Sequence, residues 1–160
     1  MKTIKGDLLD LAEAGEFNII VQGCNCFNTM GGGIAGQIAK RYPQAVAADN
    51  ETHQGDLMKL GTYTLASVTT KAGGFVIINA YTQYGTNKKE EFQDLFEYTS
   101  FQLILEKLAR LTGDKINFGF PLIGCGLAGG DEVRILKMIE DFSLVVEEQG
   151  STVTVVEWSK

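Results

Sequence analysis

Hydrophobic residues along the chain fall either into short apolar runs or into longer segments where they recur every three or four positions. Runs of the first kind are typical of strands, and the second spacing is typical of helices with one buried face. The predicted strands cover residues 3–5, 17–24, 63–69, 75–81, 115–121 and 152–158. The predicted helices cover residues 8–14, 34–41, 44–52, 90–111 and 132–148.

This alternation of strands and helices indicates an α/β fold. The run at 75–81 is almost wholly apolar, as expected for a strand that is covered on both faces. Pro43 disfavours helical backbone at Tyr42 and should end the second helix there. We therefore expect a three-layer α/β/α architecture with a mixed central sheet. The 160 residues suit a single domain that spans 1–160.

The composition is that of an ordinary globular protein, with 44% hydrophobic and 21% charged residues. The longest apolar runs are too short to cross a bilayer. The first seven residues alternate charged and apolar side chains, unlike a signal peptide. Three cysteines, an odd number, favour a reducing compartment over a disulfide framework. We therefore expect a cytoplasmic protein without a membrane partner.

The net charge of −6 argues against nucleic acid as a partner. Proteins that grip the phosphate backbone normally carry a basic patch. None is visible in the sequence, since Lys88 and Lys89 are followed at once by Glu90 and Glu91. A small anionic ligand remains compatible with this charge.

Glycine is unusually frequent and is clustered. It accounts for 19 of the 160 residues, where about 7% is usual. Four glycines lie within 31–36 and four within 124–130, and each cluster contains the spacing G-x-G-x-x-G between a predicted strand and a predicted helix. A single cluster of this kind is commonly only a tight turn, whereas two clusters in matched positions favour a binding site.

The two loops predict anion binding through the backbone. No charged residue occurs within 23–39 or 116–130. Glycine-rich backbone can converge several N–H groups on a ligand, and a helix N-terminus adds further donors. Two such loops can flank a diphosphate. A nicotinamide-binding fold is a poorer match, because Gly31 lies well past the strand and the acidic residue expected at the end of the next strand is missing.

Four segments in order give the chain a resemblance to the macrodomain, the ADP-ribose-binding module, over essentially its whole length. They are Lys5-Gly6-Asp7-Leu8, Val21-Gln22-Gly23-Cys24-Asn25, residues 30–36 and residues 121–131. They resemble, in turn, the G-D-I/L motif, the V-N-A-A-N motif and the two phosphate loops of that family. Residues 24–26, 31–35 and 123–130 are most similar to the branch that includes ADP-ribose-1″-phosphate phosphatases. The resemblance implies ADP-ribose or a derivative as the partner, and neither a cofactor nor a metal.

The resemblance also implies roles for individual residues. Asp7 corresponds to the aspartate that accepts from the adenine amine, although alone it is equally a helix N-cap. Asn25 corresponds to the asparagine that binds the distal ribose, with a loop cap as the alternative. Tyr84 is expected at the rim of the ribose or adenine site, with packing as the alternative. The other predicted ligand-binding residues are Leu8, Gly32, Gly33, Ile34, Ala35, Gly124, Cys125, Gly126 and Leu127.

Several positions depart from the hydrolytic members of the family. Gln22 stands where the yeast phosphatase has a histidine implicated in catalysis, and glutamine is not a general base near neutral pH. Ala35 stands where mono-ADP-ribosyl hydrolases have an aspartate. Tyr81 and Ala128 stand where another hydrolase branch has a lysine and an aspartate.

The candidate catalytic residues are Asn25 and Asp131, with Asp94 as a further carboxylate. Asp131 is also a good N-cap for the helix that begins at 132. The predicted function is ADP-ribose binding, and the activity to test is hydrolysis of ADP-ribose-1″-phosphate to ADP-ribose and phosphate. The alternatives are a non-catalytic ADP-ribose reader and a mono-ADP-ribosyl hydrolase. His53, the single histidine, lies in a polar turn and is expected on the surface.

Overall fold

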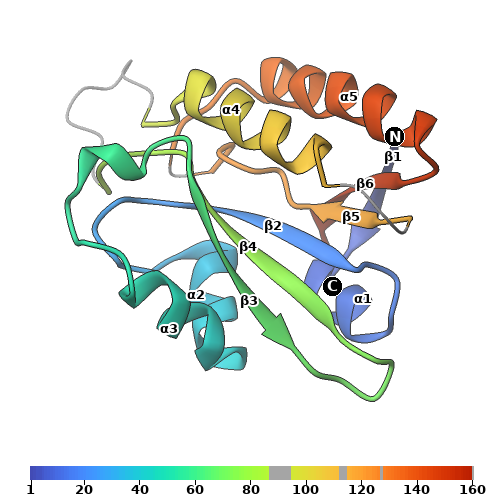
Figure 1. The fold of residues 1–160 in the computed structure, drawn as a ribbon, viewed down its shortest axis with the longest axis horizontal. Coiled ribbons are helices and arrows are strands. Elements are labelled where there is room, and N and C mark those ends of the chain that lie inside the picture. Colours follow the sequence, from blue (N-terminus) through green and yellow to red (C-terminus); the bar gives the residue numbers. More distant parts are fainter. Residues whose placement is uncertain (87–94, 112–114, 127, 160) are drawn as a thin grey trace.

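The computed structural model describes residues 1–86, 95–111, 115–126 and 128–159, and places a central β-sheet between two layers of helices (Figure 1). The strands are β1 (Lys2–Gly6), β2 (Ile19–Cys24), β3 (Tyr63–Val68), β4 (Phe75–Tyr81), β5 (Asn117–Phe120) and β6 (Thr152–Trp158). The helices are α1 (Leu8–Glu13), α2 (Gly33–Arg41), α3 (Pro43–Asn50), α4 (Tyr98–Ala109) and α5 (Glu132–Glu148), with a 3-10 turn η1 (Leu57–Lys59). The predicted α/β/α fold with a mixed sheet is confirmed.

The sheet has the strand order β1-β6-β5-β2-β4-β3. All neighbouring pairs are parallel except β3 and β4, which form an antiparallel pair. That pair is joined by a short connection in which Gly73 and Gly74 adopt φ values of 116° and 140°, a region that favours glycine. Because the other strands run in one direction, their carboxyl ends meet at one edge of the sheet.

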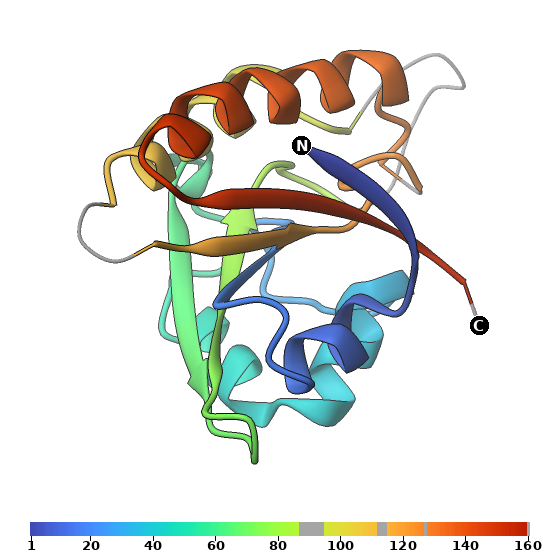
Figure 2. The ribbon, with the colours of Figure 1, turned by 90° about the vertical axis from the view of Figure 1, so that its right-hand side faces the viewer.

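A hydrophobic core lies on each face of the sheet. Helices α4 and α5 cover one face, and helices α1, α2 and α3 cover the other (Figure 2). Successive residues of β2 point to opposite faces, so Ile20 enters the core beneath α1–α3 and Val21 the core beneath α4 and α5. Ile77 and Ile78 of β4 divide in the same way. This double burial explains why both strands are nearly continuous apolar runs.

The predicted helix at 90–111 is wrong at its beginning, because α4 starts only at Tyr98. Residues 90–94 lie outside the described part of the chain. Leu95 donates its backbone N–H to Ala128 O at 2.9 Å, and Phe96 forms an isolated β-bridge with Gln83. These long-range backbone contacts replace the local helical hydrogen bonds that the periodicity alone would favour.

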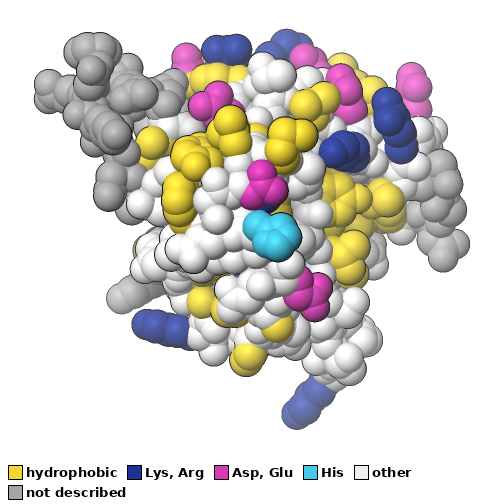
Figure 3. Space-filling view, turned by 60° about the vertical axis from the view of Figure 1, so that its left-hand side comes forward, with side chains coloured by type: hydrophobic (Ala, Val, Ile, Leu, Met, Phe, Trp, Pro, Cys, Tyr) yellow, Lys and Arg dark blue, Asp and Glu magenta, His cyan; other side chains and the backbone are white. Residues whose placement is uncertain are grey.

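Two surface features complete the fold. His53 is exposed, and Figure 3 shows its ring on the surface of the molecule, as its polar turn predicts. Among the described residues, no helix combines the length and the apolar character needed to cross a membrane.

Candidate functional site

A cavity of about 510 Å³ lies between the two glycine-rich loops, at the carboxyl ends of β2, β4 and β5. We call it the glycine cavity. Its described lining is Gly23, Cys24, Asn25, Thr29, Gly31, Gly32, Gly33, Ile34, Ala35, Thr82, Gln83, Thr86, Pro121, Leu122, Ile123, Gly124, Gly126 and Ala128. The first loop follows β2 and the second follows β5. Because these strands are paired neighbours, the sheet brings the two loops to one place.

A second cavity, of about 570 Å³, adjoins the first on the side of β1 and β6. We call it the tryptophan cavity. Its described lining is Asp7, Leu8, Leu9, Gly33, Ile34, Gln37, Pro121, Leu122, Cys125, Gly126, Val156, Glu157 and Trp158. Gly33, Ile34, Pro121, Leu122 and Gly126 line both cavities. The two cavities therefore lie side by side with a shared boundary, and we call them together the groove.

The start of α2 lies where the two cavities join. Its N-cap, Gly32, makes no side-chain capping hydrogen bond. The Gly36 N–H closes the first turn on Gly32 O at 3.2 Å. The N–H groups of Gly33, Ile34 and Ala35 precede that bond and so have no intrahelical acceptor. Such donors, together with the helix dipole, favour an anion at this point.

The glycines of the second loop serve two different purposes. Gly124 has a φ of 73°, and a Cβ there would collide with the ring of Phe96. A Cβ on Gly130 would lie 2.7 Å from the carbonyl oxygen of Gly124. Gly126, in contrast, has ordinary φ and no heavy atom within 4 Å of its Cβ position. Packing explains Gly124 and Gly130, whereas Gly126 keeps the middle of the groove open.

Asp7 lines the tryptophan cavity and caps α1 at the same time. The backbone N–H groups of Leu9 and Asp10 donate to Asp7 Oδ1 at 2.9 and 3.1 Å. The cap therefore uses one carboxylate oxygen, and the side chain retains a second oxygen as an acceptor. The position of Asp7 is compatible with both roles that the sequence allows for it, helix cap and ligand-binding residue.

Asn25 lines the glycine cavity and is held by its own loop. Its amide nitrogen donates to Thr29 O at 2.8 Å and to Thr29 Oγ1 at 2.9 Å, and its Oδ1 accepts from the Phe27 N–H at 2.8 Å. The side chain is therefore fixed in one orientation at the cavity wall, as the loop-cap alternative predicts. Both of its N–H groups are used within the loop, so it offers a ligand the remaining acceptor position on Oδ1 and no group that can take up a proton near neutral pH.

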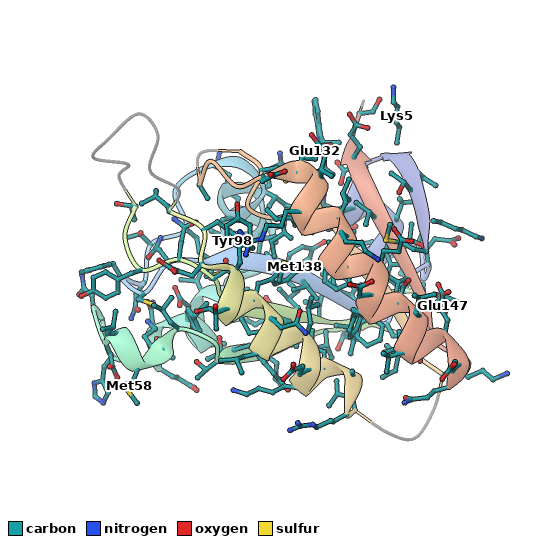
Figure 4. All side chains as sticks on the ribbon, turned by 90° about the horizontal axis from the view of Figure 1, so that it is seen from above. Lys5, Met58, Tyr98, Glu132, Met138 and Glu147 are labelled. Carbon is teal, nitrogen blue, oxygen red and sulfur yellow. The ribbon has the colours of Figure 1, made fainter. Side chains whose placement is uncertain are left out.

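The structure does not bring Asp131 or Tyr84 into the groove. Asp131 caps α5, with its Oδ1 accepting from the Arg134 N–H at 3.2 Å. Its own N–H donates to the hydroxyl of Tyr98, which lies beside the start of α5 (Figure 4). The Tyr84 hydroxyl donates to Gly55 O at 2.9 Å, and its ring packs against Phe27. Neither residue lines either cavity. Predicted Leu127 lies outside the described residues.

Trp158 is the groove residue that the sequence analysis missed. It is 62% exposed at the end of β6 and lines the tryptophan cavity. In the register of the sheet, Trp158 pairs with Gly6, so Asp7 follows directly beside it. Only the pairing of the first strand with the last brings these positions together. The signal in the sequence that could have identified it was a tryptophan at the end of the last predicted strand.

The glycine cavity is almost free of ionisable groups. Cys24 is the only one among its described lining residues, and burial, followed by the nearby Asp49 charge, raises the pKa of its thiol far above the ordinary value of 9.0. Burial also raises the pKa of Cys125 in the tryptophan cavity to about 11. Both thiols are therefore protonated and weakly nucleophilic at neutral pH. No group of three potential metal ligands gathers within the described ranges.

Gln22 and Tyr81, two positions that the sequence analysis compared with catalytic residues, are buried away from the groove. Gln22 donates to Asn79 Oδ1 at 2.8 Å, and the Tyr81 hydroxyl donates to Asp49 Oδ1 at 2.7 Å. Neither lines a cavity. Thr82 and Gln83, which follow Tyr81 directly, do line the glycine cavity, and neither carries a charge.

A buried cation supports the first loop from behind. Lys59 Nζ donates to Cys26 O at 3.2 Å and to Asn28 Oδ1, and it lies 4.7 Å from the centre of the Tyr81 ring. Asn28 has a φ of 59°, which is unusual for a residue other than glycine. These contacts fix the turn that carries Asn25.

Comparison with known proteins points to one family. The sequence model of the Macro domain family matches residues 21–139. An uncharacterized 17.5 kDa protein from the tk-vs intergenic region of Enterobacteria phage T4 is 31% identical over 99% of this chain and 96% of its own length. A protein of unknown function from Bacteroides thetaiotaomicron, 23% identical, superposes with a TM-score of 0.79 over 98% of this chain and 96% of that one. DarTG of Thermosipho africanus, solved in complex with ADP-ribose, is 14% identical, with a TM-score of 0.73 over 98% of this chain and 42% of that one.

Proposed function

Because this chain belongs to the Macro domain family, we propose that it binds ADP-ribose in the groove formed by the glycine and tryptophan cavities. The observation that carries the proposal is the junction of the two cavities at the start of α2. A diphosphate bound there would receive backbone N–H groups from α2 and from the second loop. A net-acidic protein can thereby hold an anion without lysine or arginine. The solved relative in complex with ADP-ribose supports the same ligand.

The tryptophan cavity suits the adenosine end of this ligand. The exposed indole of Trp158 offers a flat surface on which a purine can stack. Asp7 offers a carboxylate oxygen that can accept from an exocyclic amine. We place the adenine between these two side chains, at the β1–β6 end of the groove.

The glycine cavity suits the terminal ribose. Its polar side chains are amides and hydroxyls, among them Asn25, Thr29, Gln83 and Thr86. Such groups both donate and accept, which matches neighbouring sugar hydroxyls. We therefore place the terminal ribose beside Asn25, at the end of the groove that is bounded by the first loop.

The described groove supports binding without turnover better than hydrolysis. A general acid or base with a pKa near neutrality is the usual requirement for assisted attack by water. Cys24 stays protonated, and Asp131 serves as the α5 cap outside the lining. The carboxylates that do line the groove, Asp7 and Glu157, lie in the tryptophan cavity, away from the end where we place the terminal ribose. Phosphatase activity on ADP-ribose-1″-phosphate is the second candidate, favoured by the likeness of residues 24–26 and 123–130 to that branch. Asp94, the further candidate carboxylate, lies outside the described residues.

Calorimetry tests the binding proposal directly. We expect saturable heat on titration with ADP-ribose, and no heat at high micromolar ligand would contradict the proposal. Trp158 is the only tryptophan of the chain, so its fluorescence reports on the adenosine end alone. ADP-ribose, ADP and AMP should all change its emission, whereas ribose 5-phosphate should not.

Turnover assays separate the reader from the phosphatase. The protein alone is incubated with ADP-ribose-1″-phosphate and, separately, with ADP-ribosylated protein. A reader releases neither inorganic phosphate nor free ADP-ribose. Phosphate release that survives in both Asn25→Ala and Asp131→Ala would retain the phosphatase but reject the catalytic residues predicted for it.

A further inference from the structure

A buried hydroxyl without a partner lies in the wall of the glycine cavity. Among the described residues, Thr82 Oγ1 and Gln22 Oε1 are the buried side-chain oxygens that accept and donate no hydrogen bond. Of these two residues, only Thr82 lines a cavity. Leaving such a group unpaired costs free energy, so its retention calls for an explanation.

The backbone of Thr82 is held by hydrogen bonds through both its N–H and its C=O. The Thr82 N–H donates to Cys24 O at 3.2 Å, and its carbonyl oxygen accepts from the Glu97 N–H at 2.7 Å. The residue is 1% exposed and follows directly on β4. The backbone polar groups of Thr82 therefore have partners, and only its hydroxyl lacks one.

Gly23 packs tightly against this hydroxyl. A Cβ at Gly23 would lie 2.8 Å from Thr82 Oγ1, closer than real Cβ contacts come, and 3.2 Å from Ile123 Cγ1. Gly23 has no positive φ that would by itself call for glycine. Any larger residue at position 23 would press on Oγ1, and because Gly23 and Thr82 both line the glycine cavity, this unpaired hydroxyl belongs to the cavity wall.

We propose that Thr82 Oγ1 is a specificity-determining contact for a hydroxyl group of the terminal ribose. This inference rests on the proposed ADP-ribose binding and assigns a residue to one end of that ligand. The chemistry matches, since the nearby cavity wall carries the Asn25 amide, the Gln83 amide and the Thr86 hydroxyl, all neutral. A hydroxyl that both donates and accepts pairs well with a sugar hydroxyl. The ligand would supply the hydrogen bond that the protein leaves unmade.

Thr82→Val tests this inference, because valine has nearly the same shape and lacks the hydroxyl. We expect the dissociation constant for ADP-ribose to rise roughly fivefold to tenfold, as the loss of one hydrogen bond predicts. The dissociation constant for ADP, which has no terminal ribose, should not change. In the absence of ligand the melting temperature should equal or exceed that of the wild type, since an unpaired buried hydroxyl has been removed. Thr82→Ser, which restores the hydroxyl, should recover most of the lost affinity.

Two results would overturn the inference. The first is a Thr82→Val variant that binds ADP-ribose as tightly as the wild type, and the second is one that loses affinity for ADP and ADP-ribose equally. The second result would assign Thr82 a merely structural part. Failure of the proposed function is read separately, on the wild type before any variant is measured. A wild-type protein that binds neither ADP-ribose nor ADP contradicts the proposed ADP-ribose binding itself. A wild-type protein that binds the two equally tightly contradicts a contact to the terminal ribose.

Discussion

Short polar side chains around the groove are tied to the neighbouring backbone. Asp7 and Asp131 cap helices, and Asn25 closes a turn on Thr29. These residue types compete well for nearby N–H and C=O groups, so a polar residue at a loop–helix junction has a structural use before it has a chemical one. Whether such a residue also has a chemical use depends on its position: Asp7 and Asn25 line the groove and Asp131 does not.

The double use of Asp7 leads to a prediction that separates stability from binding. Asp7→Ala removes both the cap and the acceptor, so it should lower the free energy of unfolding by about 1 kcal/mol and weaken AMP binding. Asp7→Asn retains a capping oxygen and should melt close to the wild type, while AMP affinity falls by roughly tenfold or more through loss of a charged acceptor. Thermal melts and calorimetry with AMP measure the two effects. An Asp7→Asn variant that binds AMP normally would show that the residue is only a cap.

At the scale of elements, hydrophobic periodicity predicted the bounds well for strands buried on both faces and for helices with a long buried face. Strands β4 and β6 and helix α5 have the predicted bounds, because each carries a strong pattern over its whole length. The predicted start of α4 was wrong, since Leu95 and Phe96 instead make backbone contacts with residues far away in the sequence. Glycine clustering located both loops, but it could not tell which glycines serve packing and which leave space.

That distinction among glycines gives a matched pair of variants in the second loop. Gly126→Ala places a methyl group in open space at ordinary φ, so the stability should change by less than about 0.5 kcal/mol. The same methyl group enters the middle of the groove and should weaken ADP-ribose binding roughly tenfold or more. Gly124→Ala meets Phe96 at a φ of 73° and should cost about 2–4 kcal/mol of stability. Urea unfolding and calorimetry compare the two. Normal binding by Gly126→Ala would place the ligand elsewhere.

At the scale of the molecule, the groove is a product of strand order. The β2–β5 pairing unites the two loops, and the β1–β6 pairing brings Asp7 to Trp158. Nothing local in the sequence encodes these adjacencies. The motifs predicted the loops and Asp7 as parts of one site, but they included neither Trp158 nor Thr82. Their roles depend on exposure and on unmade hydrogen bonds, which only the assembled structure reveals.

The buried thiols and phenols of the chain predict how stability depends on pH. Burial raises the pKa of Cys24 and Cys26 above 9.0 and that of Tyr42 and Tyr81 above 10.0. In the unfolded chain these groups lose their protons more readily than in the folded one. Their stabilising effect is therefore complete below about pH 9 and is lost as the pH rises further, by up to about 1.4 kcal/mol per pH unit and group.

Under reducing conditions, the free energy of unfolding should accordingly be flat from pH 7 to 8.5, fall above pH 9, and fall more steeply above pH 10 as the tyrosines contribute. Urea titrations at half-unit intervals measure this. Cys24→Ala removes a thiol whose pKa burial raises, so its curve should fall less steeply between pH 9 and 10 than that of the wild type. Parallel curves for the two proteins would mean that the Cys24 thiol ionises as readily in the fold as in the unfolded chain, which would contradict its burial in the wall of the groove.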